Sequence, residues 1–220
     1  MSFPVVEKFV SINGESIRAG EPAVFIRFRG CNLNCSYCDT AWANSRDAAA
    51  QELTAEEITD YADSTGITDV TLTGGEPMLQ SGLGELTEML MAHGHRVEIE
   101  TNGSISIKEL SSSERRPSFT LDYKLPGSGM ETAMLTENYE YLCESDAVKF
   151  VVSGRDDLGR AKQIIEKYGL ADRCRVYLSP VFGRIEPAEM VSFMLENKLC
   201  NVRLQLQLHK YIWDPDKKGV

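Results

Sequence analysis

The chain has 220 residues, an ordinary globular composition and a formal net charge of −10. This length is sufficient to bury a substantial core, and we expect one domain that spans residues 1–220. The acidic charge argues against an electrostatic hold on nucleic acid or on anionic lipid, because such binding depends on clustered Lys and Arg. We therefore expect a small-molecule substrate, with no nucleic acid and no membrane as a partner.

The sequence shows no targeting or membrane-spanning pattern. Nothing at the N-terminus resembles a signal peptide, and no apolar run approaches the length of a membrane span. Clustered free thiols suit a reducing compartment, so we expect a cytoplasmic protein. Three further cysteines, Cys143, Cys174 and Cys200, are scattered without ligand spacing, and we expect them to be small buried apolar residues.

Two strands are predicted in the N-terminal part of the chain. The apolar-rich run Val5–Ile12 ends at the turn-forming sequence Asn13-Gly14-Glu15. The run Ala23–Phe28 is rich in β-forming residues and brings Arg27 to the start of a cysteine-rich loop. We expect Ala23–Phe28 to be the first strand of the core.

The loop that follows contains three thiols, Cys31, Cys35 and Cys38, within a few residues of one another. Thiolate sulfur is a preferred ligand of both zinc and iron–sulfur clusters. A structural zinc ion would need a fourth, distant ligand to complete its tetrahedron, whereas a four-iron cluster held by three thiolates keeps one iron open for chemistry. The spacing favours an iron–sulfur site, and zinc or three merely structural cysteines are the alternatives.

The rest of the chain alternates between helices and strands. Thr54 and Glu57 form a capping box that begins a helix ending near Gly66. The predicted strands that follow are Val70–Thr73, Val97–Thr101, Phe119–Tyr123, Val148–Val152, Arg175–Leu178 and Val202–Leu208, with the last run still alternating as far as Trp213. The predicted helices are Leu79–Ala92, a short one near Ile107, Glu137–Glu144, Asp156–Tyr168 and Pro187–Asn197.

This alternation with short links predicts right-handed parallel βαβ units and hence an α/β fold. The number of strands favours a parallel β/α barrel, complete or partial, over a doubly wound sheet. Parallel sheets place their sites just after the strand ends, and polar residues are found there. They are Thr73, Gly74, Gly75, Glu76, Glu100, Asn102, Asp122, Lys124, Ser153 and Ser179.

The sequence Gly74-Gly75-Glu76 is the most informative of these segments. Paired glycines let a backbone approach a ligand closely, and the carboxylate of Glu76 can accept hydrogen bonds from a cationic amine. An ordinary strand-to-helix turn has the same composition, so this segment alone leaves both interpretations open.

Taken together with an aromatic residue, Tyr37, before the last cysteine, the Cys-x3-Cys-x2-Cys loop resembles that of the radical S-adenosylmethionine (SAM) superfamily. The resemblance implies a partial β/α barrel and a 4Fe-4S cluster whose open iron binds SAM. Reductive cleavage of SAM then gives a 5′-deoxyadenosyl radical that removes a hydrogen atom from the substrate. The implied SAM contacts are Ser36, Tyr37, Asp39, Gly74, Gly75, Glu76, Glu100, Asn102, Asp122, Lys124, Ser153 and Ser179.

Within this superfamily the chain resembles the 7-carboxy-7-deazaguanine synthases over essentially its whole length. The resemblance rests on the short chain, the Asn13-Gly14-Glu15 loop, Asp39-Thr40 behind Cys38, and the C-terminal segment from His209 to Val220. It implies a Mg²⁺-dependent lyase of queuosine and 7-deazapurine biosynthesis, which converts 6-carboxy-5,6,7,8-tetrahydropterin to 7-carboxy-7-deazaguanine with loss of ammonia.

The same resemblance implies roles for further residues. Thr40 would bind Mg²⁺, and the terminal carboxylate of Val220 would reach back to the pterin. An electron donor such as flavodoxin or ferredoxin would be the protein partner, and a homodimer is the assembly to test. The implied pterin-binding residues are Ile12, Asn13, Gly14, Glu15, Arg27, Thr73, His209 and Val220.

Two positions depart from the pattern of that family. Its members often carry Gln where this chain has Asn13, and Ser-Pro-Lys where it has Asp122-Tyr123-Lys124. Two alternatives from other classes remain at this point. One is an enzyme that activates glycyl-radical proteins, which has the same cysteine spacing, and the other is a non-enzymatic iron–sulfur or zinc module.

Overall fold

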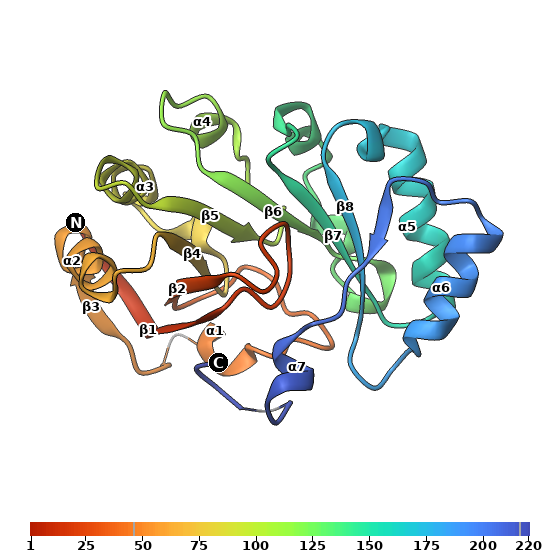
Figure 1. The fold of residues 1–220 in the computed structure, drawn as a ribbon, viewed down its shortest axis with the longest axis horizontal. Coiled ribbons are helices and arrows are strands. Elements are labelled where there is room, and N and C mark those ends of the chain that lie inside the picture. Colours follow the sequence, from red (N-terminus) through yellow and green to blue (C-terminus); the bar gives the residue numbers. More distant parts are fainter. Residues whose placement is uncertain (46, 216) are drawn as a thin grey trace.

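A computed structural model of the protein describes residues 1–45, 47–215 and 217–220. The described strands form one sheet in the order β3-β1-β2-β4-β5-β6-β7-β8-β9, which curls into an incomplete barrel (Figure 1). Their bounds are Ser2–Ile12 (β1), Pro22–Phe28 (β2), Gln51–Thr54 (β3), Asp69–Gly74 (β4), Arg96–Thr101 (β5), Ser118–Tyr123 (β6), Ala147–Val152 (β7), Arg175–Pro180 (β8) and Val202–Leu204 (β9). The predicted α/β partial barrel is therefore confirmed.

The direction of the strands follows the length of the connections. From β2 to β9 every neighbouring pair is parallel. The expectation of a wholly parallel sheet is wrong at one edge, because β1 pairs antiparallel with both β2 and β3. The link between Ile12 and Pro22 holds no helix, and parallel neighbours need a longer crossover.

Helices cover the outer side of the curved sheet, while α1, α7 and the C-terminus lie together at its open side (Figure 1). The longer helices are Ala55–Thr65 (α2), Leu83–Ala92 (α3), Arg155–Tyr168 (α5) and Pro187–Glu196 (α6). The short ones are Ala41–Asn44 (α1), Lys108–Ser111 (α4) and His209–Ile212 (α7).

Three predicted elements differ from the structure. The helix expected from Leu79 begins at Leu83, after Gly82 in a left-handed conformation at φ 84°. The helix expected over Glu137–Glu144 is a 3-10 turn at Thr136–Tyr141. The last strand ends at Leu204 instead of continuing, because the chain then turns across the open side of the barrel to form α7 (Figure 1).

The strands have two chemically different faces. Residues such as Leu72, Ile99 and Phe150 are fully buried in the core on the helix-covered side. The residues next to them in the same strands, including Thr73, Glu100 and Lys149, line a cavity on the concave side. Side chains of a strand alternate between its faces, so one sequence period builds both an apolar core and a polar interior.

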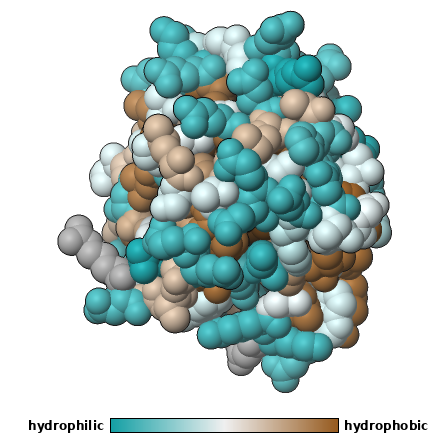
Figure 2. Space-filling model, turned by 90° about the vertical axis from the view of Figure 1, so that its left-hand side faces the viewer, coloured by the Kyte–Doolittle hydropathy of each residue, from teal (hydrophilic) through white to brown (hydrophobic). Residues whose placement is uncertain are grey.

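The face of the protein that includes α2 and α3 is mostly hydrophilic, with a hydrophobic area toward the lower right of the view (Figure 2). Of the three scattered cysteines, Cys174 is buried as expected, but Cys143 and Cys200 are exposed, so that expectation is wrong for two of them. In the described part of the chain, no helix combines the length and the apolar character that crossing a membrane requires.

The capping box of α2 is confirmed and provides a test of local stability. Thr54 Oγ1 accepts a hydrogen bond from Glu57 N (3.2 Å), and Glu57 Oε2 accepts one from Thr54 N (2.8 Å). We expect Thr54→Ala to lower the free energy of unfolding by about 1 kcal/mol, because the first turn loses its side-chain acceptor. Urea unfolding measures this change. Thr54→Ser keeps the hydroxyl and should stay close to wild type; an equal loss in both variants would contradict the capping explanation.

Candidate active site

A cavity of about 640 Å³ lies against the polar inner face of the sheet and the carboxyl ends of its parallel strands. Most of the residues expected to bind cluster, SAM or substrate line it. They are Ile12, Gly14, Glu15, Arg27, Cys31, Cys35, Tyr37, Cys38, Asp39, Thr40, Thr73, Gly74, Gly75, Glu100, Asn102, Asp122, Lys124, His209 and Val220. The expected residues Asn13, Ser36, Glu76, Ser153 and Ser179 are not among the lining residues.

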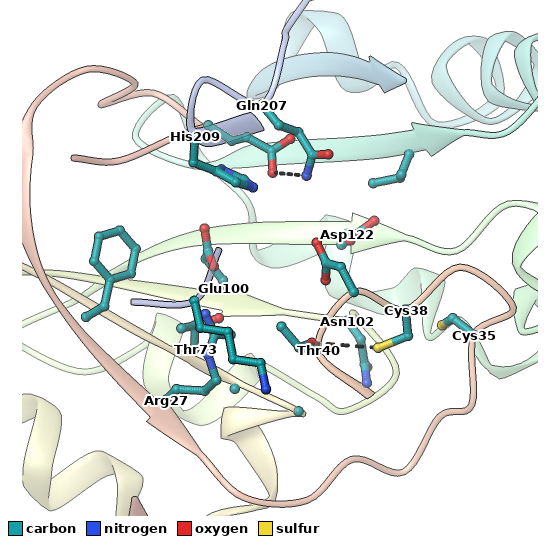
Figure 3. A pocket seen from close by; sticks show the side chains of 18 of the residues that line it. Arg27, Cys35, Cys38, Thr40, Thr73, Glu100, Asn102, Asp122, Gln207 and His209 are labelled. Atoms are coloured by element: carbon teal, nitrogen blue, oxygen red, sulfur yellow. Dashed lines mark hydrogen bonds between the residues drawn. The ribbon is translucent and has the colours of Figure 1, made fainter. Parts of the chain in front are cut away.

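The three cysteines of the loop line this cavity, and each is a partly buried free thiol. Cys35 and Cys38 lie beside each other on one side of it (Figure 3). Burial raises the pKa of Cys31 and of Cys35. Among the described residues, no three His, Cys, Asp or Glu side chains form a group that could hold a single metal ion. Three thiolates can hold a four-iron cluster and leave one iron open, whereas a structural zinc ion needs a fourth protein ligand.

Ser36 and Tyr37 fix the cysteine loop to the rest of the barrel. Ser36 donates from Oγ to Gly127 O (2.7 Å) and from N to Ser128 O (3.0 Å). Tyr37 Oη donates to Val151 O at the end of β7 (3.1 Å). The side chain of Ser36 is thus an anchor of the loop, whereas Tyr37 both anchors the loop and lines the cavity.

The Gly74-Gly75-Glu76 segment connects the end of β4 to the cysteine loop and to the end of β5. A Cβ at Gly75 would overlap the carbonyl oxygen of Gly30, so the glycine allows a close approach to the chain entering the cysteine loop. Glu76 is fully buried, and burial raises its pKa. Its carboxylate accepts from Thr101 Oγ1 (2.7 Å) and from Asn102 N (2.7 Å). Gly74 and Gly75 face the cavity, while the carboxylate joins the ends of β4 and β5.

A buried ion pair stands on the opposite wall. Glu15 accepts from Lys149 Nζ (3.2 Å), Ser179 Oγ (2.8 Å) and Gln207 Nε2 (3.1 Å). Burial acts to raise the pKa of Glu15, but Lys149 and the two neutral donors hold that pKa below its ordinary value. Burial acts to lower the pKa of Lys149, but Glu15 and Asp122 raise that pKa above its ordinary value. Both groups are therefore charged at neutral pH.

Lys149 and Gln207 were not predicted as site residues. A single lysine within the otherwise apolar strand Ala147–Val152 is the pattern that could have identified Lys149, since it falls on the polar alternation face. Ser179 supports Glu15 from β8, which accounts for its place outside the cavity wall. Ser153 donates from its hydroxyl to Asp157 Oδ2 (2.6 Å) and lies just before α5.

Asp122 projects into the cavity and lies close to two lysines (Figure 3). Its Oδ2 is 2.6 Å from Lys124 Nζ and 4.0 Å from Lys149 Nζ. Its Oδ1 is buried and has no hydrogen-bond partner among the described residues. A buried acceptor without a partner is unfavourable, so this oxygen is available to a donor group of a ligand in the cavity.

The hairpin of β1 and β2 supplies a further part of the wall. Glu7 Oε1 accepts from Arg27 Nε (2.8 Å), and the rings of Phe9 and Phe25 stack with centroids 5.0 Å apart. These cross-strand pairs follow from the register Glu7↔Arg27 and Phe9↔Phe25. Only Arg27 was expected from the sequence; the two-residue alternation along both strands could have indicated the other three.

The C-terminal segment closes the open side of the barrel. Leu208 N donates to Gly14 O (3.0 Å), and a Cβ at Gly14 would lie 2.6 Å from His209 Nδ1. Burial lowers the pKa of His209. Asn13, expected to bind substrate, is buried and accepts from Thr71 Oγ1 (3.0 Å) through its side chain. The loop from Asn13 to Glu15 is thus held against the sheet on one side and α7 on the other.

The last residues run along the cavity beside the cysteine loop. Lys218 Nζ lies 4.1 Å from the centroid of the Trp42 ring. Gly219 adopts φ 72°, which permits the bend expected before Val220, and both residues line the cavity. Nearby, Thr40 Oγ1 is 3.6 Å from Cys38 Sγ (Figure 3).

Comparisons with known proteins agree on one group. The Radical SAM superfamily matches residues 25–123. A 7-carboxy-7-deazaguanine synthase from Clostridium acetobutylicum is 53% identical over 221 residues and covers 100% of each chain. One from Chlorobaculum tepidum is 37% identical, covering 98% of this chain and 96% of its own. The crystal structure of QueE from Escherichia coli superposes with a TM-score of 0.72 at 23% identity and covers 94% of both chains, which supports the fold.

The pair of Glu15 and Lys149 predicts a pH-dependent contribution to stability. The folded-state pKa of Glu15 is lowered from 4.5, so its contribution is present above that pH and is lost as pH falls through the folded pKa. The raised pKa of Lys149 keeps the lysine charged over this range. We expect Glu15→Gln to destabilise the protein more at about pH 7 than at about pH 3.

Urea unfolding at the two pH values measures that difference. Glu140→Gln is the matched control, because Glu140 is exposed and its substitution should have the same small effect at both pH values. An equal destabilisation by Glu15→Gln at both pH values would contradict a charged pair.

Proposed function

Because this chain belongs to the 7-carboxy-7-deazaguanine synthase family, we propose that its cavity converts 6-carboxy-5,6,7,8-tetrahydropterin to 7-carboxy-7-deazaguanine with loss of ammonia. The protein is a radical SAM lyase of 7-deazapurine biosynthesis. The observation that carries the specific proposal is that three thiols line the same cavity as the Arg27 and Glu15 side chains. The full-length similarity does not favour the alternatives of a glycyl-radical activating enzyme or a non-enzymatic module.

We assign the cysteine side of the cavity to the cluster and SAM. Cys31, Cys35 and Cys38 would hold a 4Fe-4S cluster that receives its electron from a flavodoxin- or ferredoxin-type donor. When bound, the cluster and SAM supply a 5′-deoxyadenosyl radical that removes a hydrogen atom from the substrate. The residues that would bind SAM from the cavity wall are Tyr37, Asp39, Gly74, Gly75, Glu100, Asn102, Asp122 and Lys124.

We assign the opposite wall to the pterin. Arg27 donates a hydrogen bond from Nε to Glu7, which leaves its two terminal guanidinium nitrogens for a substrate carboxylate. The charged carboxylate of Glu15, held by Lys149, suits the amidine-like edge of the ring. The stacked rings of Phe9 and Phe25 give this part of the wall an apolar surface. The remaining contacts would come from Ile12, Gly14, Thr73, His209 and the carboxylate of Val220.

Turnover by anaerobically reconstituted protein, given the pterin, SAM and a reductant, is the direct test. We expect Cys35→Ala to reduce formation of 5′-deoxyadenosine to background, because the cluster loses one of its three protein ligands. Cys200→Ala is the matched control, since Cys200 is exposed and does not line the cavity. A Cys35→Ala protein that cleaves SAM at the wild-type rate, or a wild-type protein that binds iron without consuming the pterin, would refute the proposal.

We also propose that Thr40 contributes an oxygen ligand to Mg²⁺. The hydroxyl lines the cavity close to Cys38, and Mg²⁺ prefers hard oxygen ligands completed by substrate and water. Thr40→Val keeps the side-chain shape but removes this oxygen. We expect the variant to need at least tenfold more Mg²⁺ for half-maximal turnover, or about 1.4 kcal/mol of lost binding. Thr40→Ser should retain the Mg²⁺ dependence; a valine variant with unchanged dependence would exclude Thr40 as a ligand.

A further inference from the structure

Two asparagine side chains contact the cysteine sulfurs of the loop. Asn102 Nδ2 lies 3.6 Å from Cys31 Sγ, and Asn44 Nδ2 lies 3.5 Å from Cys38 Sγ. We propose that these two carboxamides donate hydrogen bonds to the cluster thiolates and raise the reduction potential of the cluster. They act as positioning and tuning residues for the reductive step. This inference rests on the proposed iron–sulfur site.

The orientation of the Asn102 carboxamide is determined by its other partners. Its Oδ1 accepts from Ser104 N (3.0 Å) and Ser104 Oγ (2.6 Å). The NH₂ group must therefore point the other way, where one N–H reaches Asn32 Oδ1 (3.0 Å). The second N–H is left for Cys31, so the donor is aimed at this sulfur by the protein itself.

The backbone beneath Asn102 is fixed by a buried carboxylate. Glu76 Oε2 accepts from Asn102 N (2.7 Å), and Glu76 Oε1 accepts from the neighbouring Thr101 (2.7 Å). Asn102 itself is 6% exposed. Glu76 thus holds the backbone of the residue whose side chain donates to Cys31. The buried position of Glu76, unexpected from the sequence, is explained if its carboxylate supports this donor.

Asn44 approaches the cluster loop from the helix that directly follows it. The chain is held there because Gly30 N donates to Ala43 O (3.1 Å). A thiolate can only accept, so the NH₂ group of Asn44 must face Cys38 once the cluster is bound. Asn44 Oδ1 is then directed elsewhere; it is buried without a partner among the described residues, and a Cβ at Gly75 would lie 2.6 Å from it.

The electrostatic consequence follows from the charge of the reduced state. One electron from an external low-potential donor takes the cluster core from 2+ to 1+, while the three thiolates remain coordinated. An N–H dipole aimed at a thiolate stabilises the more negative, reduced state more strongly. Hydrogen bonds to the sulfurs are one of the known determinants of cluster potential. In the described chain Cys35 receives no carboxamide donor, so the two donors act on two of the three ligands.

The test is an anaerobic redox titration of the reconstituted cluster, followed by electron paramagnetic resonance without SAM or substrate. We expect Asn44→Leu and Asn102→Leu each to lower the midpoint potential. A tenfold fall in the ratio of reduced to oxidised cluster at a fixed potential corresponds to about 59 mV for this one-electron couple. Asn197→Leu is the matched control, because the Asn197 carboxamide donates to Phe193 O, accepts from Lys162 Nζ and does not line the cavity. The midpoint potential of the cluster in this variant should equal that in the wild-type protein.

Iron and sulfide content shows whether each variant assembles its cluster. Wild-type protein carrying ¹⁵N-asparagine tests the contact directly, even if a variant fails to fold. We expect pulsed electron paramagnetic resonance of the reduced cluster to show hyperfine coupling to ¹⁵N. Fully loaded variants with wild-type potentials, or a wild-type cluster without ¹⁵N coupling, would overturn the inference. Failure of wild-type protein to assemble any cluster would instead refute the proposed function.

Discussion

The site depends on the close passage of two backbone segments, the chain that leaves β2 and the chain that leaves β4. Gly75 N donates to Phe28 O (3.2 Å), and Glu76 N donates to Gly30 O (2.9 Å). No Cβ fits at Gly75 against Gly30, so a larger residue would separate the segments. Because Glu76 then reaches Thr101 and Asn102 at the end of β5, the cysteine loop is tied to two successive strand ends. The loop that would hold the cluster thereby takes its position from the rigid sheet.

The polar interior of the barrel imposes a second constraint. Charges that are removed from water must be paired, and the inner wall pairs Glu15 with Lys149 and Asp122 with Lys124. A buried pair of this kind adds little net stability, because desolvation offsets the attraction. Its value here is that it keeps a carboxylate charged and oriented at the cavity. Asp122 Oδ1 and Asn44 Oδ1 are buried and accept no hydrogen bond from the described residues. A ligand bound in the cavity can supply the missing donors.

Local patterns in the sequence were sufficient for the parallel strands, the capping box at Thr54 and the cysteine loop, because each depends on neighbouring residues. The antiparallel β3 was not predictable in this way: Gln51–Thr54 has only one buried residue, Leu53, and becomes a strand by pairing with β1. The partners of Glu15 come from β7, β8 and the segment before α7, and no local pattern joins them. The prediction of a strand through Trp213 was wrong, because β9 pairs with β8 only as far as Leu204. Beyond Leu204, the path of the chain is determined by contacts with the loop at Gly14.

The incomplete barrel also explains why the two walls of the cavity have different origins. The cysteine wall includes the segments that leave β2, β4 and β5, which are neighbours in the sheet. The opposite wall requires the loop after β1 and the segment after β9, which lie on the two sides of the gap in the barrel (Figure 1). Gln205 joins them, because its side chain accepts from Ser16 N (2.7 Å) and donates to Ser16 O (2.9 Å). The same segments therefore close the barrel and build the substrate wall, whereas the three cysteines all lie in the segment that follows β2. Substitutions in the closing segments should impair substrate binding without removing the cluster ligands.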